Sequence, residues 1–127
     1  MIFIDSTALV GLLLKNDQWH NDAENIQIPY EKLVINNLVL TETLNIISKR
    51  SLLNVETIYK KIKKGAEIIC LTDDDYLNAM QKCVYYNNSI NYSDCLILTT
   101  MEKVGVNKIV SFDSGFDKVN GINRIYV

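Results

Sequence analysis

The sequence predicts an α/β fold in which helices cover both faces of a mainly parallel sheet. Short apolar segments that suit buried strands recur along the chain, and segments with helical periodicity separate them. Gly, Asn, Ser and Thr residues often stand where one segment gives way to the next. Strands that alternate with helices are typical of a parallel sheet, and they predict a three-layer α/β/α sandwich.

The first part of the chain is predicted to form two strands and two helices. Residues 1–4 are apolar throughout, as in a strand that is buried on both faces. The segment 33–36, LVIN, is the second predicted strand. The very apolar segment 6–14 begins with Ser and Thr, which favour a helix start. A short helix over 20–28 has to stop near Pro29, because proline cannot continue a helix.

The middle of the chain is predicted to hold three helices and one strand. We expect helices at 39–51, 55–64 and 74–87 and a strand at 67–71. Asn54 is a favourable N-cap for the second of these helices, and Gly65 is expected to close it. Thr72 and the aspartates at 73–75 open the third, and we interpret the three aspartates as a solvated helix start.

The last part of the chain is predicted to form a helix over 92–103 that ends at Gly105, and strands at 108–112 and 123–127. Gly105 follows the last apolar residue of the helical pattern, where a left-handed residue commonly ends a helix. All of these elements fit one domain over residues 1–127, which is a usual length for a single core.

Composition favours a globular protein without a membrane segment. Hydrophobic residues make up 48% of the chain and charged residues 22%, and no apolar run approaches the roughly 20 residues that span a bilayer. The three cysteines, Cys70, Cys83 and Cys95, form no C-x-x-C pair, so we interpret them as buried or incidental thiols of a reducing, cytoplasmic protein. The net charge of −2 does not by itself indicate a nucleic-acid partner.

Four acidic residues stand where a carboxylate is costly. Asp5 and Asp113 each follow an apolar strand directly, and the carboxyl ends of parallel strands meet at one edge of a sheet. Asp94 heads the inward stripe of its predicted helix, and Glu42 is flanked by apolar residues on its own face. Clustered carboxylates repel one another, and divalent cations such as Mg²⁺ or Mn²⁺ would hold them ionised.

Four motifs carry these acids in order along the whole chain. They are IFIDSTALV at 2–10, LTETLNI at 40–46, YSDCLILTTMEKVG at 92–105 and VSFDSGFDKVNGI at 110–122. With them the chain resembles a PIN-domain ribonuclease, and in size and layout a VapC-type toxin of a toxin–antitoxin pair. The resemblance implies an acidic quartet of Asp5, Glu42, Asp94 and Asp113 that is catalytic and binds Mg²⁺ or Mn²⁺. It also implies a further metal-binding acid at Asp117 and hydroxyl residues that border the site at Thr7 and Ser111.

The same resemblance implies a reaction and a set of partners. The reaction is metal-dependent endonucleolytic hydrolysis of RNA, with transfer RNA or ribosomal RNA as the common target. The partners are a cognate antitoxin whose tail enters the acidic groove and a second copy of the chain. The apolar segment 7–14 and the helix region 42–58 would form this homodimer.

Each acid also has a local interpretation that the sequence leaves open. Asp5 is suited to capping the next helix, Asp94 to the dipole of a helix start and Asp113 to an Asx turn, whereas Glu42 could reach solvent from a helix edge. The run KKIKK at 60–64 is either the exposed face of a helix or an RNA-phosphate contact. We interpret His20 as structural.

Two other functions stay open. One is a PIN-fold module that binds RNA or protein without catalysis. The other is a phosphoryl-transfer protein with Asp5 as its nucleophile, although Thr7 stands where the second aspartate of a D-x-D phosphatase motif belongs. If the carboxylates of the quartet are scattered over separate surfaces, the nuclease hypothesis fails.

Overall fold

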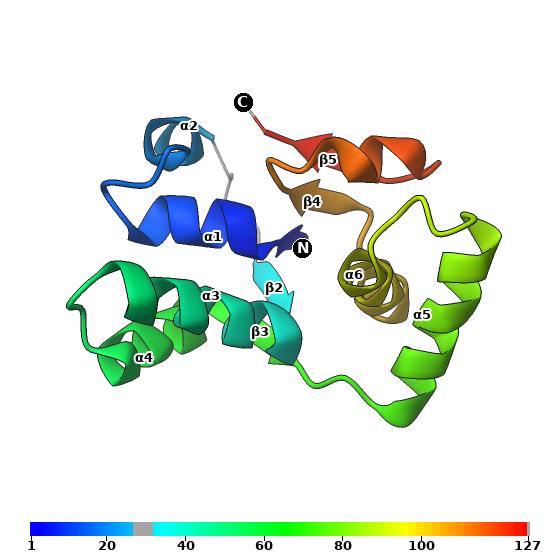
Figure 1. Ribbon diagram of the computed structural model, residues 1–127, viewed down its shortest axis with the longest axis horizontal. Helices are drawn as coiled ribbons and strands as arrows, with labels where there is room; N and C mark the ends of the chain where they lie inside the picture. The colour runs from blue at the N-terminus through cyan, green and yellow to red at the C-terminus, as the bar shows by residue number, and fades with distance from the viewer. Residues whose placement is uncertain (27–31, 127) are drawn as a thin grey trace.

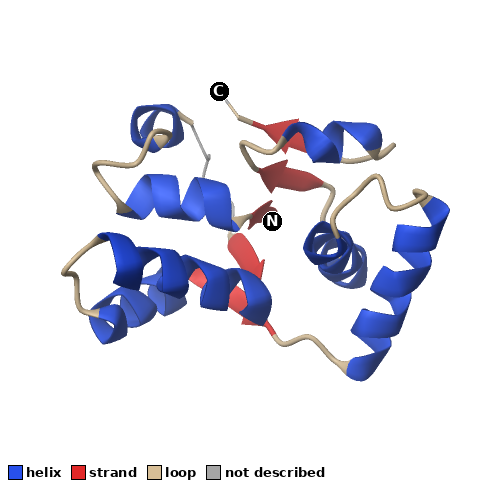
Figure 2. Cartoon of the chain, viewed as in Figure 1, coloured by secondary structure: helices blue, strands red, loops and turns tan. Residues whose placement is uncertain are grey.

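Residues 1–26 and 32–126, which the computed structural model describes, form a five-stranded parallel sheet with helices on both faces (Figures 1 and 2). The strands are β1 (Ile2–Ile4), β2 (Leu33–Asn36), β3 (Ala66–Ile69), β4 (Lys108–Val110) and β5 (Asn123–Ile125). The helices are α1 (Ser6–Leu13), α2 (His20–Asn25), α3 (Asn37–Arg50), α4 (Val55–Gly65), α5 (Asp73–Tyr85) and α6 (Tyr92–Val104), and a 3₁₀ helix, η1, covers Ser114–Lys118. The predicted α/β/α sandwich is confirmed.

The order of the strands, β3-β2-β1-β4-β5, places β1 at the centre of the sheet. The chain runs outward from β1 through β2 to β3 and then crosses to β4 and β5 on the other side. Figure 1 accordingly shows α1–α4 on one side of the sheet and α5 and α6 on the other. Ile4 pairs with Val110, so β1 and β4 end at the same level. Ligands of parallel α/β sheets bind at such a point, where the direction of winding reverses.

The core lies around the two central strands. All three residues of β1 are buried, and Ile109 and Val110 of β4 are buried beside them. Phe3 and Phe116 are the largest fully buried side chains. Residues buried on both faces of a parallel sheet explain why these strands carry no alternation of apolar and polar residues.

The helix ends follow the capping signals of the sequence. Asn54 Oδ1 accepts a hydrogen bond from Thr57 N at 3.2 Å and so begins α4, as predicted. Thr72 forms a capping box with Asp75 at the start of α5. Gly105 ends α6 with φ of 71°, in the left-handed region that the prediction required.

Several boundaries differ from the prediction. α3 begins at Asn37, earlier than expected, because Asn36 caps it and accepts from Val39 N at 2.9 Å. Gly65 is the last residue of α4, and the C-cap is Ala66, whose backbone is extended, so Gly65 is not a left-handed cap. The short helix η1 was not predicted. It has a single turn stabilised by the Asp113 cap, and so short a segment carries no periodicity.

Two predicted features extend beyond the described residues. α2 ends at Asn25, and residues 27–28 of the expected helix and Pro29 lie outside the described residues. β5 ends at Ile125, and Val127 of the expected last strand is also outside them. Among the helices that the structure describes, none has the length and apolar character to cross a membrane.

Candidate functional site

Asp5 stands directly after β1 and begins α1. Its Oδ1 atom accepts a hydrogen bond from Ala8 N at 3.1 Å, so Asp5 is the N-cap of α1. The residue is also only 4% exposed, which is unusual for a charged cap. The local role that the sequence left open is therefore present, together with a buried position at the end of the central strand.

Two hydroxyl groups hold the Asp5 carboxylate. Thr7 Oγ1 donates to Oδ1 at 2.6 Å, and Ser111 Oγ donates to Oδ2. Each hydroxyl also accepts a hydrogen bond from the loop after β4. Phe112 N donates to Thr7 at 3.2 Å, and Asp113 N donates to Ser111 at 3.0 Å. Thr7 and Ser111 thus contact the first acid of the site and fix its orientation relative to the loop that carries Asp113.

Asp113 and Asp94 lie beside each other at the same edge of the sheet. Asp113 accepts a hydrogen bond from Gly115 N at 2.9 Å and caps η1, so its Asx turn is also present. The pKa of Asp94 is raised to about 7, chiefly by burial, and the charge of Asp113, the charge of Asp5 and a side-chain hydrogen bond with Asp113 also contribute. The carboxyl group of Asp94 therefore keeps its proton in part at neutral pH.

Asp94 and Asp113 also line a polar cavity of about 240 Å³. Its other walls come from the segment before α6 and from η1, and they include Ser89, Asn91 and Lys118. The ammonium group of Lys118 donates to Ser89 O at 3.1 Å, which holds it at the rim of the cavity. The cavity thus presents carboxylates, neutral polar groups and one lysine.

Glu42 lies at the margin of this cluster. It is half-buried on α3, and its Oε2 atom accepts a hydrogen bond from Ser6 Oγ at 3.2 Å. Its charge also raises the pKa of Asp94, after the contributions of Asp113 and Asp5. The other three members of the predicted quartet therefore all raise the pKa of Asp94, and Glu42 contributes least of the three.

Asp117 is placed differently from the quartet. It is exposed on η1, and Arg124 binds both of its carboxylate oxygens at 2.9 Å. The hydrogen bonds from Arg124 lower the pKa of Asp117. Arg124 also donates to Ser111 O at 3.2 Å, so this ion pair supports the loop next to the site. A metal-binding role for Asp117 stays a prediction.

The donors at this edge suit a hard divalent cation by their chemistry. Burial raises the pKa of Asp5 as well as that of Asp94, and the charge of Asp113 adds to both. Carboxylate oxygens are the ligands that Mg²⁺ and Mn²⁺ prefer. Within residues 1–26 and 32–126, however, no three His, Cys, Asp or Glu side chains are grouped as a metal ion requires. A bound ion would need some carboxylates to turn toward it.

The sequence interpretation missed Asn36, a fully buried polar residue at the end of β2. Its side-chain oxygen caps α3, and its Nδ2 atom donates to Thr100 Oγ1 on α6 at 3.2 Å. It therefore connects the helix that carries Glu42 to the helix that carries Asp94. The signal was available, because Asn36 follows an apolar strand as Asp5 and Asp113 do.

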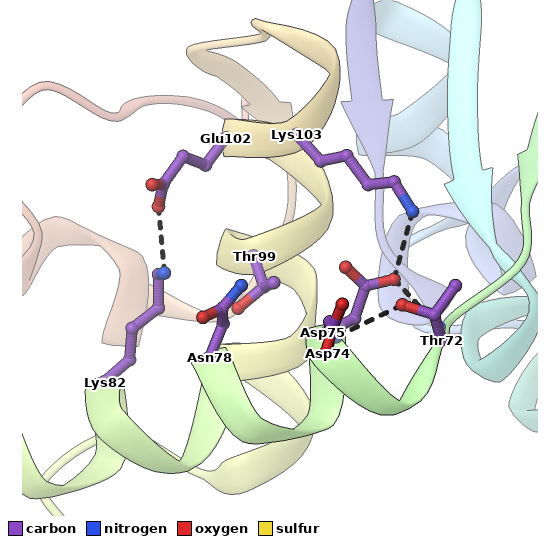
Figure 3. Close-up of a pocket in the computed structure, with 8 residues that line it drawn as sticks. All are labelled: Thr72, Asp74, Asp75, Asn78, Lys82, Thr99, Glu102 and Lys103. Carbon is purple, nitrogen blue, oxygen red and sulfur yellow. Dashed lines mark hydrogen bonds and ion pairs between the residues drawn. The ribbon is translucent and has the colours of Figure 1, made fainter.

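A larger cavity, of about 530 Å³, lies between α5 and α6 (Figure 3). None of the predicted site residues lines it. Asp75 is buried beside it, so the solvated interpretation is wrong for Asp75, although Asp73 and Asp74 are exposed as predicted. Lys103 Nζ lies 3.2 Å from Asp75 Oδ2, and Lys82 Nζ lies 2.8 Å from Glu102 Oε2, so these carboxylates are paired.

The remaining candidates have structural surroundings. His20 Nδ1 donates to Gly11 O at 2.7 Å, which ties α2 to α1. In the run 60–64, Ile62 is buried and the four lysines are exposed, as in an amphipathic helix. An RNA contact for these lysines stays a prediction.

Comparison with known proteins identifies the family. The model of the PIN domain family matches residues 2–122. The structure of the Mycobacterium tuberculosis toxin VapC20, described as Sarcin-Ricin loop cleaving, is similar with a TM-score of 0.81 and 19% identity, over 100% of this chain and 97% of that one. A toxin-antitoxin complex from Klebsiella pneumoniae is similar with a TM-score of 0.76 and 14% identity, over 96% of this chain and 95% of that one. These two likenesses concern the fold. Comparison with curated proteins gave no match.

Proposed function

We propose that this chain, which belongs to the PIN domain family, is a metal-dependent endoribonuclease and the toxin of a VapBC-type toxin–antitoxin pair. The observation that carries the proposal is the convergence of Asp5, Asp94 and Asp113 at the reversal point of the sheet, with Glu42 beside them. Uncompensated carboxylates are unfavourable for folding, and a strongly shifted pKa in a polar cavity is typical of a functional site.

Mg²⁺ or Mn²⁺ is the cofactor that these donors suit. Asp5, Asp94 and Asp113 would hold it, with Glu42 acting through water. When bound, such an ion lowers the pKa of water and offsets the charge that develops on a phosphodiester during hydrolysis. No side chain is required as a covalent nucleophile. Asp5 is poorly suited to that role, because it is buried and both of its oxygens accept hydrogen bonds.

The chain's own residues position the reacting groups. Thr7 and Ser111 fix Asp5, and Asn36 fixes the start of α3 relative to α6. Lys118 stands at the rim of the cavity, where its charge can attract an RNA phosphate. In the metal-free chain the pKa of Asp94 is raised to about 7, so a cation bound there would take the place of its proton near neutral pH.

The proposed substrate is transfer RNA or ribosomal RNA, and the proposed protein partner is a cognate antitoxin in the cytoplasm. The two structural neighbours, a Sarcin-Ricin loop cleaving toxin and a toxin-antitoxin complex, support both. A basic side chain from an antitoxin tail would be attracted by the acidic cluster.

A homodimer is also proposed, with a revised contact surface. Ala8, Leu9 and Val10 of the segment 7–14 are buried within the chain, so most of its apolar surface is already used. Within the predicted region 42–58, Leu52 and Leu53 are exposed and keep apolar surface for a second copy.

The test is cleavage of total cellular RNA by the purified chain with Mg²⁺, with Mn²⁺ or with chelator. We expect cleavage with either metal, none with chelator, and none for Asp94→Asn. Asp73→Asn is the matched control, because Asp73 also lies in the first turn of a helix but is exposed. Equal cleavage by wild type and Asp94→Asn would contradict the proposal.

The same preparations separate the other two functions. Wild-type protein that binds RNA without cleaving it under any metal condition would indicate a non-catalytic PIN-fold module. A phosphorylated Asp5, detected by mass spectrometry after incubation with a phosphoryl donor, would indicate a phosphoryl-transfer protein.

A further inference from the structure

Two of the three cysteines are in contact between α5 and α6. Cys83 Sγ on α5 lies 3.3 Å from Cys95 Sγ on α6, and the two residues are 12 positions apart in the sequence. Figures 1 and 3 show α5 lying across α6, so the packing of the two helices brings the thiols together. Cys95 is buried, Cys83 is half-buried and Cys70 is exposed. The two thiols therefore differ in access to solvent while remaining in contact.

We propose that Cys83 and Cys95 form a reversible intramolecular disulfide when the protein meets a peroxide. The distance between sulfur atoms in a disulfide is about 2.05 Å, so the two sulfurs have to approach by about 1.3 Å from their 3.3 Å separation. Both residues lie on helices, and a change of side-chain rotamer or a small shift of α5 can supply this movement. Neither thiol needs to leave the helix interface.

The order of events follows from exposure. The half-buried Cys83 thiol meets the peroxide first, its sulfur bonds to one peroxide oxygen, the O–O bond breaks, and a sulfenic acid and one water result. Cys95 Sγ then attacks the Cys83 sulfur, the S–S bond forms, the S–O bond breaks, and the hydroxyl leaves as a second water with the Cys95 proton. Two thiols and one peroxide thus give one disulfide and two waters.

The closing step is expected to be slow. Cys95 is fully buried at the helix interface, so its sulfur can reach the oxidised Cys83 only after a movement of the helix or side chain. Oxidation should therefore be followed over hours at neutral pH.

The disulfide would tie α5 to the first turn of α6. Cys95 is adjacent to Asp94 and fully buried, so a covalent bond at Cys95 restrains the same helical turn. Formation of the disulfide involves the thiols alone and does not depend on nuclease activity.

Trypsin makes the experiment direct. No Lys or Arg lies between residues 83 and 103, so Cys83 and Cys95 fall in one tryptic peptide, 83–103, whereas Cys70 falls in 65–82. The full chain is incubated with hydrogen peroxide, quenched, alkylated under denaturing conditions, digested and analysed by mass. We expect peptide 83–103 to lose both alkylation sites and two hydrogen atoms, and dithiothreitol to restore both sites.

Two variants complete the test. Cys70→Ser is the matched control and should keep the disulfide, since Cys70 is exposed and lies between β3 and α5, outside the two helices that bring the pair together. Cys83→Ser should leave Cys95 alkylated after denaturation, and it is preferred to a change at the fully buried Cys95 because it disturbs the core less. A peptide 83–103 that keeps both alkylation sites, carries only added oxygen, or is linked to 65–82 would overturn the proposal.

Discussion

The two acidic regions of this protein differ in what their carboxylates face. Between α5 and α6, Asp75 faces Lys103 at 3.2 Å, and Glu102 faces Lys82 at 2.8 Å (Figure 3). Burial would raise the pKa of Asp75, but hydrogen bonds from Thr72 and Lys103 outweigh it and the pKa is lowered. At the ends of β1 and β4, Asp94 faces other carboxylates and its pKa rises to about 7.

The paired carboxylates between α5 and α6 contribute to stability, whereas the clustered carboxylates at the ends of β1 and β4 indicate a functional site. A buried carboxylate with a cation beside it contributes to folding, whereas one surrounded by carboxylates opposes folding and is tolerated at functional sites. The denser acidic run in the sequence, 73–75, belongs to the first kind of region, so the number of acids in a stretch does not identify the site.

The largest expected difference between the regions is in RNA cleavage. Asp5→Asn or Asp113→Asn should lower the rate by on the order of 10²- to 10³-fold, because each removes a charged group proposed to contact the reacting centre. Asp75→Asn should change it by less than about threefold at a temperature where the variant is folded. Initial rates of cleavage of a purified RNA measure these changes. An equal loss of rate in Asp5→Asn and Asp75→Asn would show that the two regions do not differ in function.

The next difference is in the free energy of unfolding. Asp75→Asn should destabilise the protein by about 1–2 kcal/mol, since it breaks the ion pair of a buried carboxylate with Lys103. The exposed neighbour change Asp73→Asn should stay within about 0.5 kcal/mol. Urea unfolding measures both values. If Asp73→Asn costs as much as Asp75→Asn, the pairing with Lys103 is not what stabilises α5.

For Asp94→Asn we expect a change in the free energy of unfolding of the opposite sign to that of Asp75→Asn. Its pKa in the folded protein, about 7, lies above the ordinary value of 3.8, so the folded state holds a proton that the unfolded chain has already lost between these values. Protonated Asp94 therefore stabilises the folded state at low pH, and this stabilisation is lost as the pH rises through about 7. After allowance for solvent screening, we expect the free energy of unfolding of Asp94→Asn to be larger than that of wild type by on the order of 1 kcal/mol at pH 8.

Urea unfolding of metal-free wild type and Asp94→Asn, in the presence of chelator at pH 5 and pH 8, tests this sign. The advantage of the variant should be larger at pH 8, because wild-type Asp94 is then ionised among other carboxylates. A variant that is less stable than wild type at pH 8 would show that Asp94 has an uncounted cationic partner.

The smallest effect is expected at Asp117. Arg124 already occupies both of its oxygens, so Asp117→Asn should lower RNA cleavage by less than about threefold. The RNA-cleavage rate of Asp113→Asn, measured in the same experiment, is the reference for a large effect. A loss as large as that of Asp113→Asn would place Asp117 among the metal ligands.

Much of the fold could be predicted because its signals are local. The apolar segments of β1 and β2, the Asn54 cap and the left-handed Gly105 are each visible within a few residues. Helix η1 could not be predicted, since its single turn depends on the cap at Asp113. The Pro29 prediction falls outside the described residues.

The sequence predicts where the acidic residues of the site lie, but not which carboxylates have a compensating partner. Parallel strands bring Asp5 and Asp113 to one edge, and helical spacing places Asp94 on an inward face. The partners that decide whether a carboxylate is compensated lie far away in the sequence. Lys103 is 28 residues from Asp75, and Ser111 is 106 residues from Asp5, so no local pattern reports them.

The hydroxyl groups around Asp5 have a consequence during protein synthesis. Ser111, which holds one of the Asp5 oxygens, is made 106 residues after Asp5. A nascent chain therefore cannot assemble this acidic edge until β4 and the loop after it have left the ribosome and β4 has joined β1 in the sheet. If the chain cleaves its host's RNA, the ribosome that makes it does not meet a complete acidic edge before that point of synthesis.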